Sequence, residues 1–330
     1  MTRERVAITG ASGLLGGNLA AELHAAGCEV VALRRGSSRV SQLADLPITW
    51  REAALDDVPA LTRAFDGCAA VFHCAAALGV SRTVSPEMRA TNVTGTANVI
   101  DAVVAARVPR LVHTSSVVAV GLSTNGQPCD ETAPWNFEQE GLIDAYAITK
   151  HEAEELVHAA RERVDAVIVN PAYMFGPRDA KPSSGSMILD IVRRRTPGWT
   201  PGHNNFVDVR DVARGMIAAW HKGRRGERYL LLGHDLTYGD AFRTIAKVAG
   251  VKPPRFQVPH AAAWLMGKWG DFREARGKEA IANSTQIRYA FTNKFRFAST
   301  KAANELGYTF GPLQPAIADA LAWWRANGML

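Results

Sequence analysis

Along the first half of the chain, short runs of apolar and β-branched residues alternate with longer stretches in which apolar residues recur at helical spacing. This alternation predicts parallel strands joined by crossover helices. The strands are apolar on both faces, as expected when helices cover each side of a sheet. We therefore predict a doubly wound α/β fold. The strands are expected at residues 5–10, 29–35, 48–53, 69–76, 110–117 and 165–173, and the helices near residues 14–26, 58–66, 86–106 and 144–163.

After residue 171 the alternation becomes less regular, and segments rich in Pro, Gly, Ser and Asn interrupt it. From residue 206 the pattern predicts a strand and a helix that return to the main sheet, followed by one more strand. The chain is therefore expected to divide into two parts. The nucleotide-binding domain would comprise residues 1–171, with residues 206–233 returning to it, and a smaller substrate-binding lobe would comprise residues 172–205 and 234–330.

Composition narrows the class of protein. With 47% hydrophobic and 21% charged residues, the chain is unlike a disordered one. No apolar run approaches the roughly 20 residues of a membrane span, and the residues before the first predicted strand are not expected to form a secretory signal. We therefore expect a cytoplasmic protein. The net charge of +6 is scattered, which argues against nucleic-acid binding. The four cysteines lack CxxC spacing, so we expect reduced thiols and no metal site.

Three glycines follow the first predicted strand and open the first predicted helix. Gly10 permits a tight turn, Gly13 lets the backbone approach a pyrophosphate, and Gly16 lets the helix pack closely on the sheet. Unpaired N–H groups at the helix N-terminus face the phosphates. The alternative is a turn built from small packing residues. The context of strand, turn and helix favours dinucleotide binding by Gly10, Ser12, Gly13, Leu14, Leu15 and Gly16.

The end of the second predicted strand bears on the choice of cofactor. Sites for NAD usually place an acidic residue there to hold the ribose 2′-hydroxyl. This chain places Arg34 there instead, followed by Arg35, Ser37 and Ser38. A guanidinium binds a 2′-phosphate through two hydrogen bonds, so the sequence favours NADP(H) over NAD(H). An arginine stacked on adenine, or simply solvated, is the alternative.

Tyr146 precedes Lys150 by four residues at the head of a predicted helix, so the two share a helical face. Hydride transfer to a carbonyl leaves negative charge on oxygen, which requires a proton donor. A phenol with a pKa of about 10 gives up its proton reluctantly, and a nearby ammonium lowers that pKa. Ser115 and Ser116 follow the fifth strand, at the edge where such sheets bind ligands. By itself, the four-residue spacing does not distinguish a catalytic pair from two residues that merely share one face of a helix.

Several motifs in a fixed order are more specific than any one of them. Together with the GxxGxxG turn and the Tyr–Lys pair, they resemble the extended short-chain dehydrogenase/reductases over nearly the full chain. That resemblance implies a Rossmann-type sheet with a smaller C-terminal substrate-binding lobe. The motifs are GASGLLG, VFHCAA (71–76), TNVTGTANV (91–99), NPAYMFGP (170–177), FVDVRDVA (206–213) and FRFASTKAANELGY (295–308).

The resemblance implies roles for individual residues. Ser116 would bind the carbonyl oxygen, Tyr146 would be the acid/base, and Lys150 would tune it and hold the nicotinamide ribose. Ser115 would line the same pocket, and the Asn92 segment would support the active-site strand. Where the family often has an aspartate that holds the adenine amino group, this chain has Ala54. The further implied cofactor contacts are Leu55, Ala75, Ala76 and Pro171.

Two enzymatic branches of the superfamily compete. Sugar-nucleotide epimerases and dehydratases tend to show an Arg-Asp pair and the segment RPxNxYGP, whereas this chain has HNNFVDV and NPAYMFGP. Dehydratases also need an Asp-Glu pair beside the serine, where this chain has Val117 and Val118. The segments NPAYMFGPRDAKPSSG and RYLLLGHDLTY resemble the dihydroflavonol-4-reductase-like branch. We therefore expect an NADPH-dependent reductase of a fairly apolar ketone or aldehyde.

Side chains of the substrate-binding lobe support an apolar substrate. Tyr173 and His203 are expected contacts, beside Ser115, Ser116 and Tyr146. Aromatic walls suit a ring-bearing or aliphatic ketone, and core packing is the alternative for each side chain. The wall candidates are Trp135, Phe137, Tyr173, Met174, Phe175, Trp199 and Phe206.

The sequence is also compatible with other functions. The enzymatic alternatives are a sugar-nucleotide epimerase and a 3β-hydroxysteroid dehydrogenase-like enzyme. The alternative outside enzymes is an NADP-sensing regulatory protein. Apolar residues on more than one face of the helices near 86–106 and 144–163 permit a homodimer or burial within the subunit.

Overall fold

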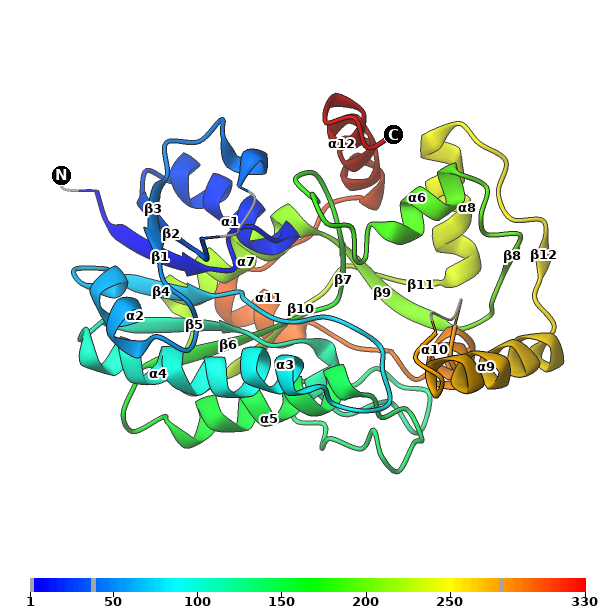
Figure 1. Ribbon diagram of the computed structural model, residues 1–330, viewed down its shortest axis with the longest axis horizontal. Helices are drawn as coiled ribbons and strands as arrows, with labels where there is room; N and C mark the ends of the chain where they lie inside the picture. Colours follow the sequence, from blue (N-terminus) through cyan, green and yellow to red (C-terminus); the bar gives the residue numbers. More distant parts are fainter. Residues whose placement is uncertain (1–2, 37–39, 279–281) are drawn as a thin grey trace.

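The computed structural model describes residues 3–36, 40–278 and 282–330. Its centre is a sheet of seven strands, all paired in parallel, in the order β10-β6-β5-β4-β1-β2-β3 (Figure 1). The strand order reverses between β1 and β4, and ligands of such sheets bind at this point, beyond the carboxyl ends of the strands. The strands are β1 (Arg5–Thr9), β2 (Glu29–Arg34), β3 (Thr49–Glu52), β4 (Ala70–His73), β5 (Arg110–Thr114), β6 (Ala166–Pro171) and β10 (Arg228–Leu231).

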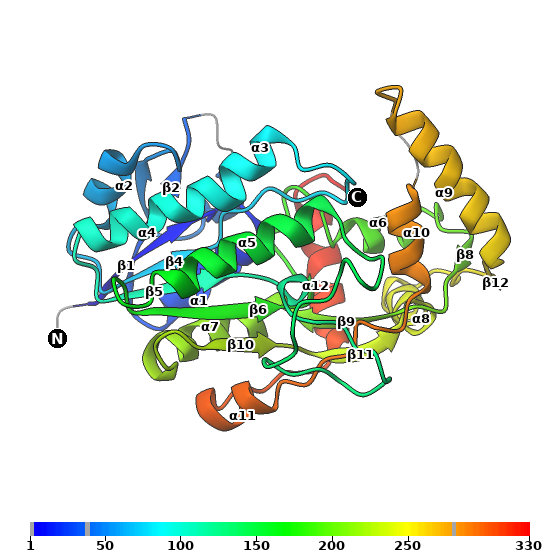
Figure 2. The same cartoon turned by 90° about the horizontal axis from the view of Figure 1, so that it is seen from below.

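Helices cover both faces of this sheet, and alternate strand residues serve two cores. In β1, Val6 and Ile8 join one core and Ala7 joins the other. The first core includes residues of α1 (Leu14–Ala25), α7 (Val209–Lys222) and α11 (Thr300–Leu306). The second includes residues of α2 (Val58–Phe65), α4 (Gly95–Ala105) and α5 (Ala145–Ala159), and Figure 2 shows α4 and α5 side by side.

The remaining elements form a smaller lobe beside the sheet. Strands β7 (Tyr173–Phe175), β9 (His203–Asp208) and β11 (His234–Thr237) make a three-stranded sheet, and β8 (Gly198–Trp199) pairs with β12 (Phe256–Gln257). Residues of α6, α8 and α12 share a third core with β7 and β9. The helices are α6 (Ser186–Val192), α8 (Tyr238–Ala249), α9 (His260–Glu274), α10 (Ser284–Phe291) and α12 (Leu313–Ala326).

The doubly wound sheet predicted from the sequence is confirmed, with two local corrections. The strand expected to return to the main sheet from residue 206 is β9, which pairs with β7 and β11 instead; helix α7 and strand β10 do lie with the large sheet. The single helix expected over 86–106 is divided into α3 (Pro86–Arg89), a π-helical turn (Ala90–Thr94) and α4. The division into domain and lobe, and pairing of two copies through α4 and α5, stay predictions.

Within the described ranges, none of the helices combines the length and the apolar character needed to cross a membrane.

Candidate active site

The glycine turn after β1 leaves no room for side chains at two positions. Gly10 has a φ of +72°, and a Cβ there would lie 2.6 Å from the backbone nitrogen of Ala75, just after β4. A Cβ on Gly16 would overlap the carbonyl oxygen of Gly10. These two glycines therefore bring the start of α1 against the ends of β1 and β4.

The N-terminus of α1 suits an anion. Gly13 is the N-cap residue, its backbone is exposed, and no side chain caps the helix. The first turn carries no acidic residue, so an anion would meet unpaired N–H groups and the positive end of the helix dipole. The Ser12 carbonyl accepts a hydrogen bond from Gln42 Nε2 at 2.8 Å, which holds the turn in place. The turn therefore fits the pyrophosphate of a dinucleotide.

At the end of β2, Arg34 stands opposite Glu52 of β3 in the parallel register. In the portion of the chain that the structure describes, the Arg34 side chain forms no hydrogen bond or ion pair. Its guanidinium is therefore available to an anionic ligand. Ser37 and Ser38, which the sequence also placed here, lie outside the described residues.

On the expected adenine side, Ala54 stands where the family often has an aspartate, and hydrogen bonds hold the loop around it. The Leu55 carbonyl accepts a hydrogen bond from Asn98 Nδ2 at 2.7 Å, and the Ala54 carbonyl accepts one from the Asp57 backbone at 3.2 Å. The Leu55 side chain packs on Gly95, where a Cβ would lie 2.9 Å from Leu55 Cδ1. Leu55 is thus held at this edge by α4.

Asn92 joins the segment after β4 to helix α5. Its Oδ1 accepts from the Ala77 backbone at 2.7 Å, and its Nδ2 donates to the Ala77 carbonyl and to Thr149 Oγ1, both at 3.0 Å. The π-helical turn places this side chain in the interior. Ala75 is held separately, since its backbone N–H donates to Thr9 Oγ1 at 3.3 Å.

Tyr146 lies in the first turn of α5. The helix begins there because Asp144 accepts a 2.7 Å hydrogen bond from the Ala147 backbone. Burial raises the pKa of the Tyr146 phenol to about 12, and a hydrogen bond with the Ser116 hydroxyl acts in the opposite direction. Ser116 itself caps the short 3-10 turn that follows β5. The structure thus brings Ser116 and Tyr146 together at the carboxyl edge of the sheet.

Lys150 is buried one turn further along α5. Its Nζ donates a 2.6 Å hydrogen bond to the carbonyl oxygen of Thr114, the last residue of β5. Burial lowers the pKa of Lys150 to about 8, and the Glu154 carboxylate partly offsets this. Burial has the largest influence on the Tyr146 phenol and raises its pKa, and the expectation that Lys150 lowers this pKa stays a prediction.

Glu154 is a buried carboxylate that the sequence analysis missed. It accepts hydrogen bonds from Asn170 Nδ2 at 2.7 Å and from Arg228 Nη1 at 2.9 Å. Although burial opposes ionisation, the neighbouring His158, Ser115 and Arg228 hold the pKa of the Glu154 carboxyl below its usual value. The available signal was its spacing, four residues after Lys150 on one helical face.

Two buried histidines at the ends of β4 and β5 are not proton donors at neutral pH. The rings of His73 and His113 lie 5.4 Å apart. Burial, reinforced by the charge of Lys150, lowers the pKa of His73 to about 3 and that of His113 well below its ordinary value. Both imidazoles are therefore neutral at pH 7.

Some expected wall residues lie in the cores. Ser115 is buried and close enough to Glu154 to influence the pKa of that carboxyl, and its contact with a substrate stays a prediction. Phe137, Phe175 and Phe206 are fully buried core residues, so they cannot form a pocket wall. The reason is strand and helix packing, which turns these side chains into two of the cores.

Tyr173 and His203 belong to the small sheet. Tyr173 packs edge-on against Phe206, with ring centroids 5.6 Å apart, and burial raises the pKa of its phenol. His203 Nδ1 lies 3.2 Å from the Asp235 carboxylate on β11. Both side chains already have protein partners, and their contact with a substrate stays a prediction.

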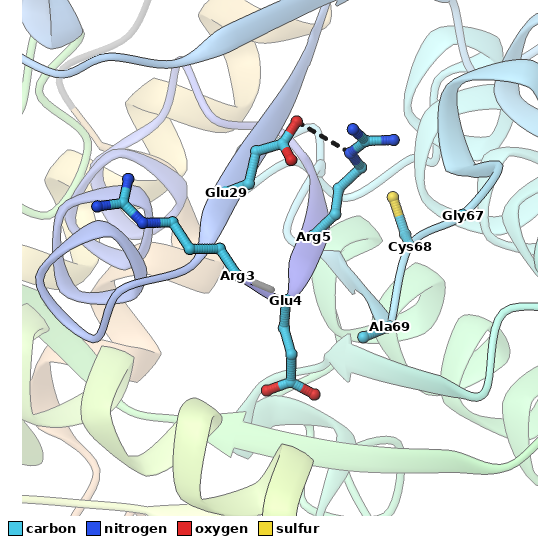
Figure 3. A pocket seen from close by; sticks show the side chains of 7 residues that line it. All are labelled: Arg3, Glu4, Arg5, Glu29, Gly67, Cys68 and Ala69. Atoms are coloured by element: carbon cyan, nitrogen blue, oxygen red, sulfur yellow. Dashed lines mark hydrogen bonds and ion pairs between the residues drawn. The ribbon is translucent and has the colours of Figure 1, made fainter. Parts of the chain in front are cut away.

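A surface pocket at the opposite edge of the sheet does not carry this chemistry. It is lined at the amino ends of β1, β2 and β4, and Figure 3 shows Arg5 paired with Glu29. The Arg5 Nε and Glu29 Oε1 atoms lie 2.9 Å apart. Burial raises the pKa of the Cys68 thiol there to about 11, so the thiol is not a nucleophile at neutral pH. The candidate active site therefore lies at the carboxyl edge.

Comparison with known proteins identifies the class that this fold defines, the NAD(P)-dependent oxidoreductases that act on carbonyl or alcohol groups. Residues 6–231 match the NAD dependent epimerase/dehydratase family. The chain belongs to this family. Its relatives confirm the resemblance to the dihydroflavonol-4-reductase-like branch of the extended short-chain dehydrogenase/reductases.

Two relatives and one solved structure illustrate these similarities. A Synechocystis relative, whose name assigns it provisionally as a dihydroflavonol 4-reductase, is 34% identical over 97% of this chain and 94% of its own. A Stigmatella aurantiaca protein named 4-hydroxy-2-methyl-3-oxo-4-farnesyl-3,4-dihydroquinoline-1-oxide ketoreductase is 29% identical over 92% of this chain and 91% of its own. The solved structure of a nucleoside-diphosphate-sugar epimerase from Pseudomonas aeruginosa matches with a TM-score of 0.82 and 28% identity, over 100% of both chains.

Proposed function

We propose that the protein is an NADPH-dependent reductase of a fairly apolar ketone or aldehyde. The observation that carries the proposal is the meeting of Ser116, Tyr146 and Lys150 at the carboxyl end of β5. A phenol, a hydroxyl and an ammonium at one edge are the groups that carbonyl reduction requires.

The chain supplies the proton and the hydrogen bonds of the reaction. Tyr146 donates its proton to the carbonyl oxygen as negative charge develops there, and Ser116 donates a hydrogen bond to the same oxygen. The raised pKa of Tyr146 keeps the phenol protonated at neutral pH, as a proton donor must be. The bound dinucleotide supplies the hydride.

Lys150 holds a positive charge next to this pair. An ammonium has three N–H donors, and Thr114 uses one of them. The others are left for the nicotinamide ribose, and the charge stabilises the phenolate that remains once Tyr146 has given up its proton. Pro171, at the end of the neighbouring strand β6, would bound the nicotinamide.

The choice of NADPH rests on Arg34. The α1 turn of Gly10, Ser12, Gly13, Leu14, Leu15 and Gly16 would hold the pyrophosphate, and Leu55, Ala75 and Ala76 would border the adenosine and nicotinamide halves. Arg34 is the last residue of β2, and its side chain has no protein partner among the described residues. Its guanidinium is therefore free to bind a 2′-phosphate.

An apolar substrate is supported by a relative. Ser116 and Tyr146 would face the carbonyl, and Tyr173 and His203 are the proposed contacts from the small sheet. The ketoreductase relative is named for a farnesylated ring ketone, which is an apolar carbonyl compound. The epimerase alternative draws on the similar Pseudomonas aeruginosa structure, so nucleotide sugars belong in the same assay.

The test is a spectrophotometric screen with NADPH and NADH against aromatic aldehydes, diketones, dihydroflavonols, steroids and nucleotide sugars. We expect oxidation of NADPH by an apolar carbonyl compound, and Tyr146→Phe should lower kcat at least about a hundredfold. Tyr308→Phe is the control, because it removes a buried hydroxyl that binds the Leu232 carbonyl at 2.7 Å, away from the site. Unchanged turnover in Tyr146→Phe, or turnover of nucleotide sugars alone, would refute the proposal.

A further inference from the structure

Helix α9 has its large apolar side chains outside and its small residues inside. Four large side chains are strongly exposed: Trp264 (51%), Leu265 (62%), Trp269 (60%) and Phe272 (45%). Its buried residues are Ala263, Gly267 and Gly270. An ordinary surface helix has the reverse arrangement, with its apolar stripe toward the core.

The packing of α9 against α10 requires small residues on the inner face of α9. A Cβ on Gly270 would overlap the carbonyl oxygen of Ala282, and one on Gly267 would lie 3.1 Å from Ser284 Cα. Glycines let the two helices approach closely, so large side chains have no place on the inner face. The large apolar side chains of α9 therefore lie on its outer face.

Charges on α9 are also sorted by face. Its two acidic residues turn toward α10, where Asp271 accepts from the Ser284 backbone at 2.9 Å and Glu274 accepts from Asn283 Nδ2 at 3.1 Å. Basic residues lie among the exposed rings: Lys268 Nζ is 6.0 Å from the Trp264 centroid. Just after the helix, the Arg276 guanidinium is 3.5 Å from the Phe272 centroid. The outer face is thus aromatic and cationic.

This combination is the one that suits a lipid headgroup region. Tryptophan and phenylalanine rings insert at the boundary between headgroups and acyl chains, and lysine and arginine bind the phosphates of anionic lipids. We propose that the outer face of α9, made by Trp264, Leu265, Lys268, Trp269, Phe272 and Arg276, docks on an anionic lipid bilayer. The helix has 15 residues and lies on the surface rather than crossing it.

The position of α9 gives this docking a consequence for the active site. Figures 1 and 2 place α9 at the end of the molecule opposite α2. The loop after β4 links it to α5: Asn283 Nδ2 donates to the Val80 carbonyl, and the Ala145 backbone donates to the Ser81 carbonyl, both at 2.9 Å. Ala145 directly precedes Tyr146. A docked bilayer would therefore contact a part of the molecule that is joined by hydrogen bonds to the turn before Tyr146, and docking itself does not depend on the proposed reaction.

The experiment is flotation of the full chain with vesicles of phosphatidylcholine alone or of equal parts phosphatidylcholine and phosphatidylglycerol. We expect binding to the mixed vesicles that weakens as salt is added. Leu265→Glu/Trp269→Glu and, separately, Lys268→Glu/Arg276→Glu should each lower the bound fraction at least about tenfold. The controls are Phe310→Glu, an exposed apolar side chain at 43%, and Arg63→Glu on α2, and neither should change binding.

Three results would overturn the proposal. One is no flotation of the wild-type chain with the mixed vesicles. Another is an equal loss of binding in the control variants. The third is a wild-type dimer that Leu265→Glu/Trp269→Glu converts to a monomer without any vesicle binding, which would make this face an interface between copies.

A second measurement tests the proposal even if a glutamate variant fails to fold. Vesicles with brominated acyl chains should quench the tryptophan fluorescence of the wild-type chain, and the conservative Trp264→Phe/Trp269→Phe variant should bind with most of that quenching lost. Quenching that is unchanged in this variant would place the lipid contact elsewhere and contradict the proposal.

Discussion

The ammonium of Lys150 donates a 2.6 Å hydrogen bond to the carbonyl oxygen of Thr114. This contact fixes one positive charge between helix α5 and the last residue of β5, in a buried setting where charge is costly. Its position makes the charge sensitive to pH and to the buried carboxylate next to it.

The first prediction concerns the pH dependence of the reaction. The pKa of Lys150 is lowered to about 8, so its ammonium is present below that pH and lost above it. We therefore expect kcat/KM for carbonyl reduction to fall as pH rises through about 8. Lys150→Met should remove this alkaline limb as well as most activity. A profile of wild-type kcat/KM that stays flat through this range would contradict the assignment.

The charge of Glu154 should set the pH at which kcat/KM falls. Its negative charge raises the pKa of Lys150, so Glu154→Gln should move the limb to lower pH. The same change leaves Arg228 without its charged partner and should lower the free energy of unfolding by about 3 kcal/mol, measured in urea. Glu152→Gln, on the same helix, breaks only an exposed pair with Arg89 and should cost less than about 1 kcal/mol.

Glu154 and Glu152 can be told apart by the pH profile alone. The Glu152→Gln limb should coincide with that of the wild type, since Glu152 does not influence Lys150. An unshifted limb in Glu154→Gln would mean that Glu154 supports the fold without affecting the charge on Lys150.

Arg34 should decide between the two dinucleotides. Losing a charge-assisted hydrogen bond to a 2′-phosphate costs about 1.5–3 kcal/mol, so Arg34→Ala should raise the KM for NADPH about ten- to hundredfold. The KM for NADH should hardly change. Arg51→Ala, on the adjacent strand β3, is the control and should leave both values alone. An equal rise of both constants in Arg34→Ala would count against 2′-phosphate recognition.

Two neighbouring glycines of α1 should respond oppositely to alanine. A Cβ on Gly16 overlaps the Gly10 carbonyl oxygen, so Gly16→Ala should lower the free energy of unfolding by about 1–3 kcal/mol and weaken NADPH binding. A Cβ on Gly17 comes no closer than 3.4 Å to Ala11, and Gly17→Ala should be neutral or stabilising by up to about 1 kcal/mol. Thermal unfolding and fluorescence titration with NADPH measure both, and equal effects would contradict the close approach at Gly16.

The sequence alone determined features that depend on local order. Strand, glycine turn and helix follow one another within β1 and α1, so the backbone conformation at Gly10 could be predicted from neighbours in the chain. The alternation of strands and helices likewise specified the doubly wound sheet, because buried parallel strands must be apolar on both faces. Motif order brought Ser116, Tyr146 and Lys150 into one hypothesis.

Only the tertiary structure decided where side chains meet across distant segments. It placed β9 in the small sheet, turned Ser115 toward Glu154, and enclosed Phe137 in a core. It also turned the bulky face of α9 outward. Periodicity states which residues share a face of a helix or strand. It does not state which other element that face meets, because this depends on contacts between residues far apart in the chain.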